Sequence, residues 1–279
     1  MRSSCNLKIT STGGALGAFV EGLDLSKVLS EAIVQNIQRA FWQYSVLVFR
    51  GQALSEKDQV SFSRYLCDPR PHPTNLENIG ALPEICIISN VIEGGKPVGA
   101  LGCGEVAFHA DLAFRAELGT VSILYAKEAP DDSGLTSWSS GMLAYKALDG
   151  ATREKLSRVS IIYSHSKKEY LSENPAIHPL IISHPESQLP SMYFSSGHAL
   201  RVEGMSQSAS DDLIGWLRLY TAKSDFVWTH RWKPGDLIVW DNRTTQHRRS
   251  EVESTKRRFM RRTQAVGFLV PNSSGFKPG

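Results

Sequence analysis

The sequence lacks the features that mark several large classes of protein. Its four cysteines, Cys5, Cys67, Cys86 and Cys103, form no C-x-x-C pair, so neither a zinc ribbon nor a redox dithiol is indicated. We expect all four to be small buried side chains. No apolar run approaches the roughly 18 residues that a membrane helix needs. The first residues lack the apolar segment of a secretory signal, and we therefore expect a cytoplasmic protein without a membrane partner.

The sequence also lacks a large excess of charge of one sign. Lys and Arg number 31 against 28 Asp and Glu, a formal charge of +3 that is too small to indicate a nucleic-acid partner. The chain of 279 residues can bury a sizeable core. No repeat or linker divides it, which predicts a single domain over residues 1–279. A homo-oligomer is possible, although no heptad or apolar surface stripe predicts one.

Strand-like segments are more prominent than helical ones. The composition and turn signals predict strands at 45–50, 85–91, 121–126, 226–229, 236–240 and 260–269. Helical spacing predicts helices at 27–42 after an N-cap at Ser26, from Ser55 toward Tyr65, and at 140–148, 153–159 and 210–220. Residues 68–83 and 99–104 are predicted loops. The strands do not alternate regularly with helices, so we expect a mainly β fold with flanking helices, a sandwich or jelly roll.

The segment Phe108-His109-Ala110-Asp111 is the first candidate for chemistry. In a strand, residues i and i+2 point to the same face, so His109 and Asp111 would aim at a common point. A second histidine from a distant strand would complete the 2-His-1-carboxylate triad of non-haem iron oxygenases. A surface histidine hydrogen-bonded to a nearby Asp is the alternative explanation of the bare motif. The similar His184-Pro185-Glu186 contains a central proline and is expected in a turn or at a sheet edge.

The C-terminal third adds a histidine and a row of arginines. A buried strand at 237–240 is followed by a turn and then by His247. Further on, the period of two places Arg258, Met260, Arg262 and Gln264 on one strand face. Arginines there are costly to bury without anions, and a guanidinium matches a carboxylate bidentately. The alternative is a solvated basic edge, to which we assign Arg248, Arg249, Arg257 and Arg261.

Taken together, these segments resemble the taurine dioxygenase and 2,4-dichlorophenoxyacetate dioxygenase (TauD/TfdA) family of Fe(II)- and 2-oxoglutarate-dependent enzymes. The stretch "GDLIVWDNRTTQH" at 235–247, with the arginines beyond it, is the most specific part of the resemblance. The other segments that carry it are "SVLVFRGQ" (45–52), "FHADLAF" (108–114), "SILYAKEAP" (122–130), "GLTSWSSGMLAYKAL" (134–148), "HPLIISHP" (178–185) and "RRFMRRT" (257–263).

The resemblance implies a double-stranded β-helix, a cupin-like form of jelly roll. It implies that His109, Asp111 and His247 bind Fe(II), and that 2-oxoglutarate and O2 are cosubstrates. It also implies that Arg258 holds the distal carboxylate of 2-oxoglutarate beside the hydroxyl of Thr136. Arg262 would hold the acidic group of the substrate.

The resemblance also indicates a substrate pocket. His72 is similar to a substrate-contacting histidine of an early loop, although an exposed loop histidine is an equal alternative. Phe108, Leu112 and Phe114 flank the metal motif and would line the pocket, unless they only pack in the core. Phe108 and Ala110 stand where the family usually has Trp and a hydroxyl residue, a departure expected to alter hydrogen bonding around the metal.

The reaction implied is hydroxylation of a small, anionic organic substrate, with release of succinate and CO2. A carboxylate at Asp111 disfavours halogenation, which family relatives perform without that ligand. Desaturation or oxidative rearrangement of an amino-acid-derived acid, and a non-catalytic metal-binding jelly-roll module, remain alternatives. Nucleic-acid binding through residues 256–262 is a further alternative, but it lacks interleaved aromatic residues and a recognised motif.

Overall fold

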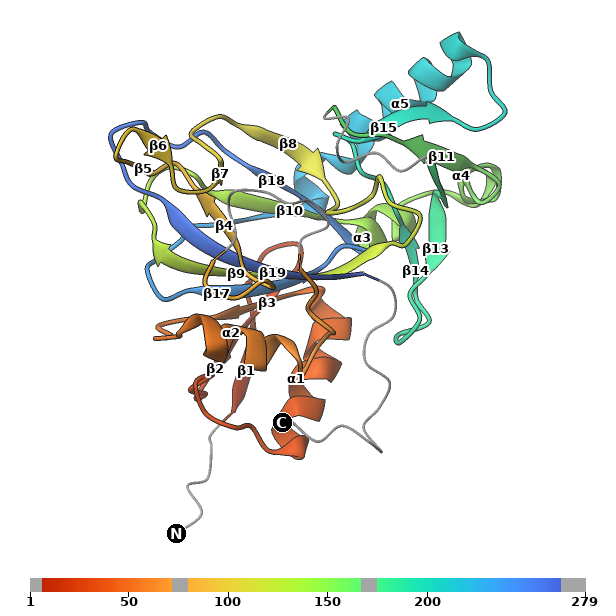
Figure 1. The fold of residues 1–279 in the computed structure, drawn as a ribbon. Helices are drawn as coiled ribbons and strands as arrows, with labels where there is room; N and C mark the ends of the chain where they lie inside the picture. Colours follow the sequence, from red (N-terminus) through yellow and green to blue (C-terminus); the bar gives the residue numbers. More distant parts are fainter. Residues whose placement is uncertain (1–6, 72–79, 167–174, 267–279) are drawn as a thin grey trace.

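The computed structural model describes residues 7–71, 80–166 and 175–266. Two sheets face one another in the body of the molecule (Figure 1). The strand order of the larger sheet is β1 (Lys8–Ser11), β2 (Ala18–Glu21), β3 (Val46–Phe49), β17 (Leu237–Asp241), β9 (Gly119–Glu128), β19 (Phe259–Val266), β4 (Cys86–Ser89) and β7 (Ala100–Leu101). The smaller sheet has the order β16 (Val227–His230), β10 (Thr136–Ser140), β18 (Thr245–Arg249) and β8 (Val106–His109). This arrangement is the expected jelly roll.

Smaller elements surround these sheets. A three-stranded sheet consists of β12 (Ala176–Pro179), β11 (Ser160–Tyr163) and β15 (Ala199–Val202). Two pairs of short strands are β13 (Ile181–Ser183) with β14 (Pro190–Met192), and β5 (Ile92–Glu93) with β6 (Lys96–Pro97). The helices are α1 (Glu31–Tyr44), α2 (Glu56–Ser63), α3 (Gly141–Lys146), α4 (Gly150–Leu156), α5 (Gln207–Thr221) and the short 3-10 helix η2 (Ser224–Phe226).

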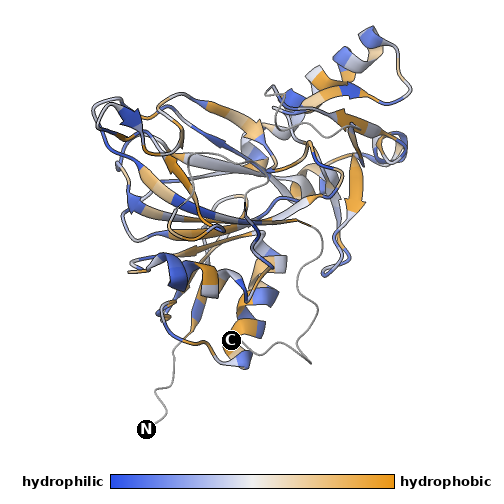
Figure 2. Ribbon diagram, viewed as in Figure 1, coloured by the Kyte–Doolittle hydropathy of each residue, from blue (hydrophilic) through white to orange (hydrophobic). Residues whose placement is uncertain are grey.

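The central strands of the larger sheet are buried on both faces. In β3 the side chains of Val46 and Val48 face the smaller sheet, and those of Leu47 and Phe49 face helices α1 and α2. Because both faces are covered, this strand is apolar throughout instead of alternating. The hydrophobic strands at the centre of Figure 2 and the two helices beneath them show this layering.

The predicted first helix was wrong at its start. Helix α1 begins at Glu31 after Ser30, four residues later than expected. The preceding residues form a turn instead, because the backbone N–H and hydroxyl of Ser26 both donate to Asp24 Oδ1. The capping box at Ser55 and Asp58 is confirmed, with both reciprocal bonds present. The helix predicted at 153–159 begins earlier, at Gly150, because the Asp149 side chain accepts from Thr152 N–H.

The cysteines, the loop at 99–104 and His184 agree only in part with the predictions. Cys67 and Cys86 are buried as expected, but Cys103 is only half-buried, and Cys5 lies outside the described residues. The predicted loop at 99–104 contains the two-residue strand β7, which pairs with β4. His184 lies at the end of β13, just before a turn, as its proline neighbour predicted, yet it is 1% exposed.

A buried ionic cluster explains that histidine. His184 Nε2 lies 2.8 Å from Asp241 Oδ2, and Arg243 Nη2 lies 2.6 Å from the same oxygen. Arg243 also pairs with Glu186 at 3.0 Å. The cluster thus joins the β17–β18 turn to the hairpin of β13 and β14, and it holds the start of β18 in place.

We expect Phe41→Ala to lower the free energy of unfolding by about 3–5 kcal/mol, because the ring is fully buried between α1 and the larger sheet. Val28→Ala is the matched control, since Val28 is 84% exposed and its truncation should cost less than about 0.5 kcal/mol. Urea unfolding measures both. Equal losses for the two variants would contradict the packing described above.

Candidate functional site

Strand register brings His247 beside His109. In the smaller sheet, His247 pairs directly with His109 on β8 and with Trp138 on β10. Directly opposed residues of antiparallel strands project to the same face. The two imidazole rings accordingly lie 4.2 Å apart, and Trp240 of the facing sheet packs 4.7 Å from His247. The predicted association of these two histidines is therefore present in the fold.

Asp111 joins them by a route that differs from the expected one. Strand β8 ends at His109, and Asp111 lies in the turn that follows. The chain leaves the sheet because the Ala110 N–H donates to Ser195 Oγ and the Asp111 N–H donates to Asn242 Oδ1. One ligand atom from each of His109, Asp111 and His247 lies within 4.8 Å of the others. Two imidazoles and one carboxylate are the donor set that suits Fe(II) with open coordination positions.

A polar network that the sequence did not single out holds the carboxylate. Ser122 Oγ donates to Asp111 Oδ2 at 2.6 Å, and Asn242 Nδ2 donates to Ser122 Oγ at 2.9 Å. Asn242 Oδ1 also accepts from Trp240 Nε1 at 3.1 Å. Asn242 lies in the turn at 241–243, within the stretch at 235–247 that carries the resemblance, but the sequence predicts no role for it. The network fixes the orientation of Asp111, as hydrogen bonds around metal ligands commonly do.

The charges around Asp111 keep it ionised. Burial by itself would raise the pKa of this carboxyl, but Arg262, His247 and His109 outweigh burial and hold the pKa well below its usual range. Arg262 Nη1 lies 3.2 Å from Asp111 Oδ1. Arg262 Nε has no hydrogen-bond partner among the described residues. An ionised carboxylate is the form that binds a metal.

Arg258 and Thr136 offer buried hydrogen-bond donors that suit an anion. Arg258 is 2% exposed, and its Nε and Nη1 have no partner within the described part of the chain. Burial, with the charge of Arg249, lowers the pKa of Arg258 to about 9. Thr136 is buried on β10, and its Oγ1 accepts from Trp232 Nε1 at 2.9 Å, which leaves the hydroxyl proton to donate. A carboxylate that enters here meets ready donors, so the residues fit 2-oxoglutarate.

Two arginines assigned to a solvated edge are buried instead, so that prediction was wrong for them. Arg261 is 5% exposed because it lies over the Tyr125 ring and donates to the Leu54 carbonyl. Arg249 is also 5% exposed, on the face of β18 that carries His247. Arg248 and Arg257 are exposed as predicted. Burial of a long charged side chain depends on which element covers its strand, and the period of two does not contain that information.

The predicted substrate-lining residues are placed differently from one another. His72 lies outside the described residues. Phe108 projects to the face of β8 opposite His109 and lies under the guanidinium of Arg248, 5.0 Å away. Leu112 and Phe114 form a small apolar cluster with Val266 in the turn that carries Asp111. Of the three apolar candidates, Leu112 and Phe114 thus belong to the segment on the metal-ligand side.

Two further histidines stand beside this cluster and were not predicted. The Phe114 ring is 4.8 Å from the His165 ring and 5.1 Å from that of His198, which in turn lies 5.6 Å from His109. His198 Nδ1 shares a hydrogen bond with Ser195 Oγ at 2.9 Å. Neither histidine lies in a recognisable motif, so no sequence signal pointed to them. Together with Phe114 they form an aromatic wall next to the three ligand residues.

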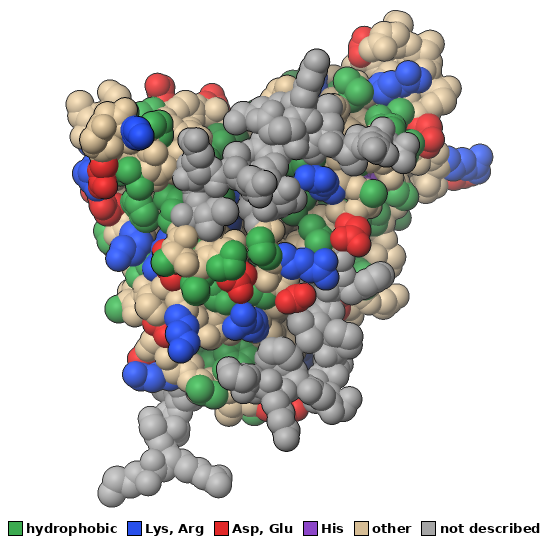
Figure 3. Space-filling model, viewed as in Figure 1, with side chains coloured by type: hydrophobic (Ala, Val, Ile, Leu, Met, Phe, Trp, Pro, Cys, Tyr) green, Lys and Arg blue, Asp and Glu red, His purple; other side chains and the backbone are tan. Residues whose placement is uncertain are grey.

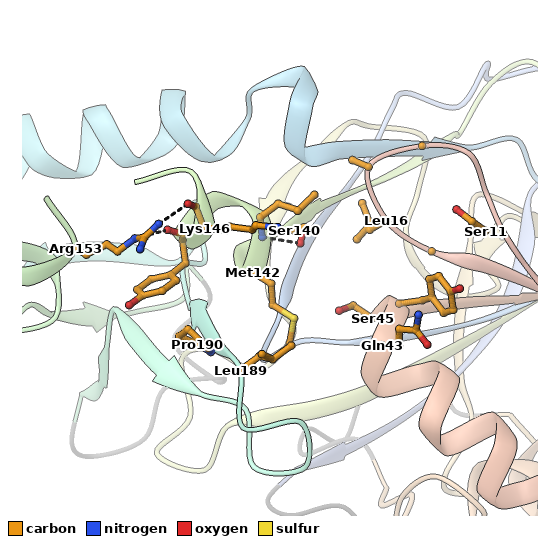
Figure 4. A pocket seen from close by; sticks show the side chains of 16 residues that line it. Ser11, Leu16, Gln43, Ser45, Ser140, Met142, Lys146, Arg153, Leu189 and Pro190 are labelled. Atoms are coloured by element: carbon orange, nitrogen blue, oxygen red, sulfur yellow. Dashed lines mark hydrogen bonds between the residues drawn. The ribbon is translucent and has the colours of Figure 1, made fainter. Parts of the chain in front are cut away.

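A separate cavity of about 440 Å³ lies away from the three ligand residues, between the β1–β2 turn, the end of α1 and helix α3. Figure 4 shows Met142, Leu189 and Pro190 on one side of it and Leu16 and Ser45 on the other. Its lining includes neither the three ligand residues nor Arg258. The chemistry of the donor atoms, and not the size of a cavity, therefore identifies the candidate site.

We expect the metal-free protein to lose stability as the pH falls from about 6.5 toward 3. Burial, with the charge of His109, lowers the pKa of both His247 and His198 to about 3. In this range the unfolded chain binds more protons than the folded chain. Each of the two histidines therefore lowers the free energy of unfolding by about 1.4 kcal/mol for every pH unit by which the pH decreases. Urea unfolding at pH 7, 6, 5 and 4 measures the slope. His198→Gln should reduce this slope by about 1.4 kcal/mol per pH unit, the contribution of one histidine. An unchanged slope in that variant would contradict the lowered pKa of His198.

Comparison with known proteins places the chain among dioxygenases. It is 30% identical over 269 residues to an (S)-phenoxypropionate/alpha-ketoglutarate-dioxygenase of Delftia acidovorans, covering 87% of this chain and 89% of that protein. It is 29% identical over 287 residues to an alpha-ketoglutarate-dependent sulfate ester dioxygenase of Pseudomonas putida, covering 94% and 90%. Alpha-ketoglutarate is another name for 2-oxoglutarate.

The fold agrees with this relationship. The structure of AAD-2 in complex with Mn(II) and N-oxalylglycine superposes with a TM-score of 0.83 at 24% identity, covering 94% of this chain and 98% of that one. The family model "Taurine catabolism dioxygenase TauD, TfdA family" matches residues 8–264, a span that includes His109, Asp111, His247, Thr136, Arg258 and Arg262. The chain therefore belongs to the TauD/TfdA family of Fe(II)- and 2-oxoglutarate-dependent dioxygenases.

Proposed function

We propose that this enzyme hydroxylates a small anionic organic substrate at an iron held by His109, Asp111 and His247. The observation that carries the proposal is that these three residues converge on one point while the buried Arg258 has no hydrogen-bond partner for its Nε and Nη1 among the described residues. A structural metal site needs no buried cation of this kind, whereas a dicarboxylate cosubstrate does. Bound Fe(II), 2-oxoglutarate and O2 together supply the chemistry of C–H hydroxylation, with release of succinate and CO2.

The residues of the chain position the reactants. Arg258 and the hydroxyl of Thr136 bind the distal carboxylate of 2-oxoglutarate and so orient its other end toward the metal ligands. Ser122 and Asn242 hold the Asp111 carboxylate in one orientation. Trp240 and Trp138 pack around His247 and are themselves nearly inaccessible, which keeps water away from that side of the site.

The substrate side has both a cation and an aromatic surface. Arg262 has an unpartnered Nε among the described residues and lies against the Asp111 carboxylate, so an anionic group bound there stands close to the metal. Leu112, Phe114, His165 and His198 offer apolar and aromatic contacts to the rest of the molecule. The names of the two relatives refer to a phenoxypropionate and to a sulfate ester, both anionic compounds. An aryloxyalkanoate or a sulfate ester fits the same combination here.

The sequence also makes predictions about partners, location and oligomeric state. On the face that Figure 3 shows, Lys, Arg, Asp and Glu side chains of the described residues are interspersed. The absence of a nucleic-acid partner stays a prediction. No helix in the described ranges combines the length and apolar character that crossing a bilayer would require. A cytoplasmic location, a single domain over residues 1–279 and the possible homo-oligomer stay predictions.

Asp111→Ala is expected to reduce succinate release in the presence of Fe(II), 2-oxoglutarate and substrate to the background level, because one metal ligand is lost. The weak visible absorption of the anaerobic Fe(II)–2-oxoglutarate complex should disappear as well. The exposed Asp212→Ala on α5 is the control and should keep both signals. Circular dichroism checks the fold of both variants. Full activity in Asp111→Ala would refute the proposed iron site.

The substrate class is tested by a succinate-release screen across sulfonates, sulfate esters, aryloxyalkanoates and amino-acid-derived acids, each beside a neutral analogue. We expect turnover of anionic compounds only. For the best of them, Arg262→Met should raise KM about ten- to a hundredfold, the value of one charge-assisted bond. The exposed Arg257→Met should leave KM unchanged. Equal turnover of acids and neutral analogues would rule out anion recognition.

A further inference from the structure

Arg249 is a buried cation without an explanation in the family pattern described above. Its side chain comes from β18 and is 5% exposed. Its Nη2 donates to the carbonyl oxygens of Leu101 and Gly104, but Nε and Nη1 have no partner among the described residues. Two unmet donors on one buried guanidinium are costly, so a further acceptor is expected at this position.

Strand register places Arg249 in the cosubstrate part of the site. It lies two residues after His247 and therefore on the same face of β18. In the pairing of β18 with β10, Arg249 stands directly opposite Thr136, and opposed side chains project to the same face. Arg249 and the proposed cosubstrate-binding threonine are thus neighbours.

Arg258 approaches the same place from the facing sheet. Its side chain passes Gly134, two residues before Thr136, so closely that a Cβ on Gly134 would lie 3.0 Å from Arg258 Cδ and 3.2 Å from Nε. Gly134 has φ +65°, so the backbone conformation and the close approach both favour glycine. After burial, the charge of Arg249 is the second cause of the lowered pKa of Arg258, which means that the two guanidiniums act on one another.

No carboxylate within the described ranges forms an ion pair with either Arg249 or Arg258. Each guanidinium keeps unpaired Nε and Nη1 groups, and each is nearly inaccessible to water. Two like charges that are buried together without a counter-ion repel each other. A single carboxylate between them removes this repulsion and accepts from both, since its two oxygens offer about four lone-pair directions.

We propose that Arg249 binds the distal carboxylate of 2-oxoglutarate together with Arg258, so that this chain grips its cosubstrate with two guanidiniums. The inference rests on the proposed function and names an additional cosubstrate-binding residue. No covalent step is involved. Arg249 contributes donors and charge, while Thr136 supplies the hydroxyl between them.

The competing explanation is that Arg249 is structural and only ties the Leu101 and Gly104 carbonyls to β18. A structural residue would affect all 2-oxo acids alike when it is replaced. A residue that binds the distal carboxylate would affect only those that carry this group. The difference between two ligands on the same variant therefore separates the two explanations, whatever the variant does to stability.

The experiment compares 2-oxoglutarate with 2-oxopentanoate, in which a methyl group replaces the distal carboxylate. Binding to the anaerobic Fe(II) enzyme is titrated by its visible absorption, for the wild type and for Arg249→Met, Arg249→Lys, Arg258→Met and the exposed Arg257→Met. We expect Arg249→Met to weaken 2-oxoglutarate binding about ten- to a hundredfold and to change 2-oxopentanoate binding less than about threefold. Arg249→Lys should lie between this variant and the wild type, because it keeps the charge without the fork of donors.

The outcomes distinguish this inference from the function on which it rests. If the wild type does not prefer 2-oxoglutarate, both fail. The inference is overturned, and the proposed function stands, if Arg258→Met loses the preference for 2-oxoglutarate over 2-oxopentanoate while Arg249→Met keeps the wild-type ratio of the two dissociation constants. Equal weakening of both ligands by Arg249→Met likewise overturns it in favour of the structural role. A smaller preference for 2-oxoglutarate in both Arg249→Met and Arg258→Met, with Arg257→Met unchanged, supports binding of the distal carboxylate by both arginines.

Discussion

The antiparallel pairing of β18 with β8 and β10 is the constraint on which the site depends. This register sets His247 opposite His109 and Arg249 opposite Thr136, so one set of backbone bonds aligns both the proposed metal ligands and the proposed anion-binding residues. The start of β18 is held by the buried pair of Asp241 and Arg243, which joins the turn to the β13–β14 hairpin. A one-residue slip would turn every one of these side chains to the other face.

The interior of the jelly roll is unbalanced in charge before any ligand is counted. Arg249, Arg258 and Arg262 project toward it, whereas Asp111 is the acidic member of the ligand group. A ferrous ion adds further positive charge. Such an interior attracts anions strongly, because a low-dielectric surrounding weakens charge interactions less than water does. The need for a dicarboxylate cosubstrate and the proposed preference for an acidic substrate thus have one electrostatic origin.

Much of the site could be read from the sequence because it depends on short-range patterns. The buried strand before the "WDNR" turn, His247 beyond it, and the capping box at Ser55 each have a local signature. The position of Asp111 could not be derived in this way, since its turn is set by Ser195 and Asn242, which are distant in the chain. The burial of Arg249 and Arg261 was missed for the same reason. The late start of α1 shows a different limit, because the Asp24 turn competed with helical spacing at residues 24–27.

The aromatic wall has a different construction from the metal ligands. Phe114, His165 and His198 all lie in connecting segments, after β8, after β11 and before β15. His109 and His247, in contrast, are fixed by paired strands. Connecting segments tolerate replacement far better than sheet positions do. A lineage of such enzymes can therefore acquire new substrates by exchanging loop side chains while the oxidising centre is inherited unchanged.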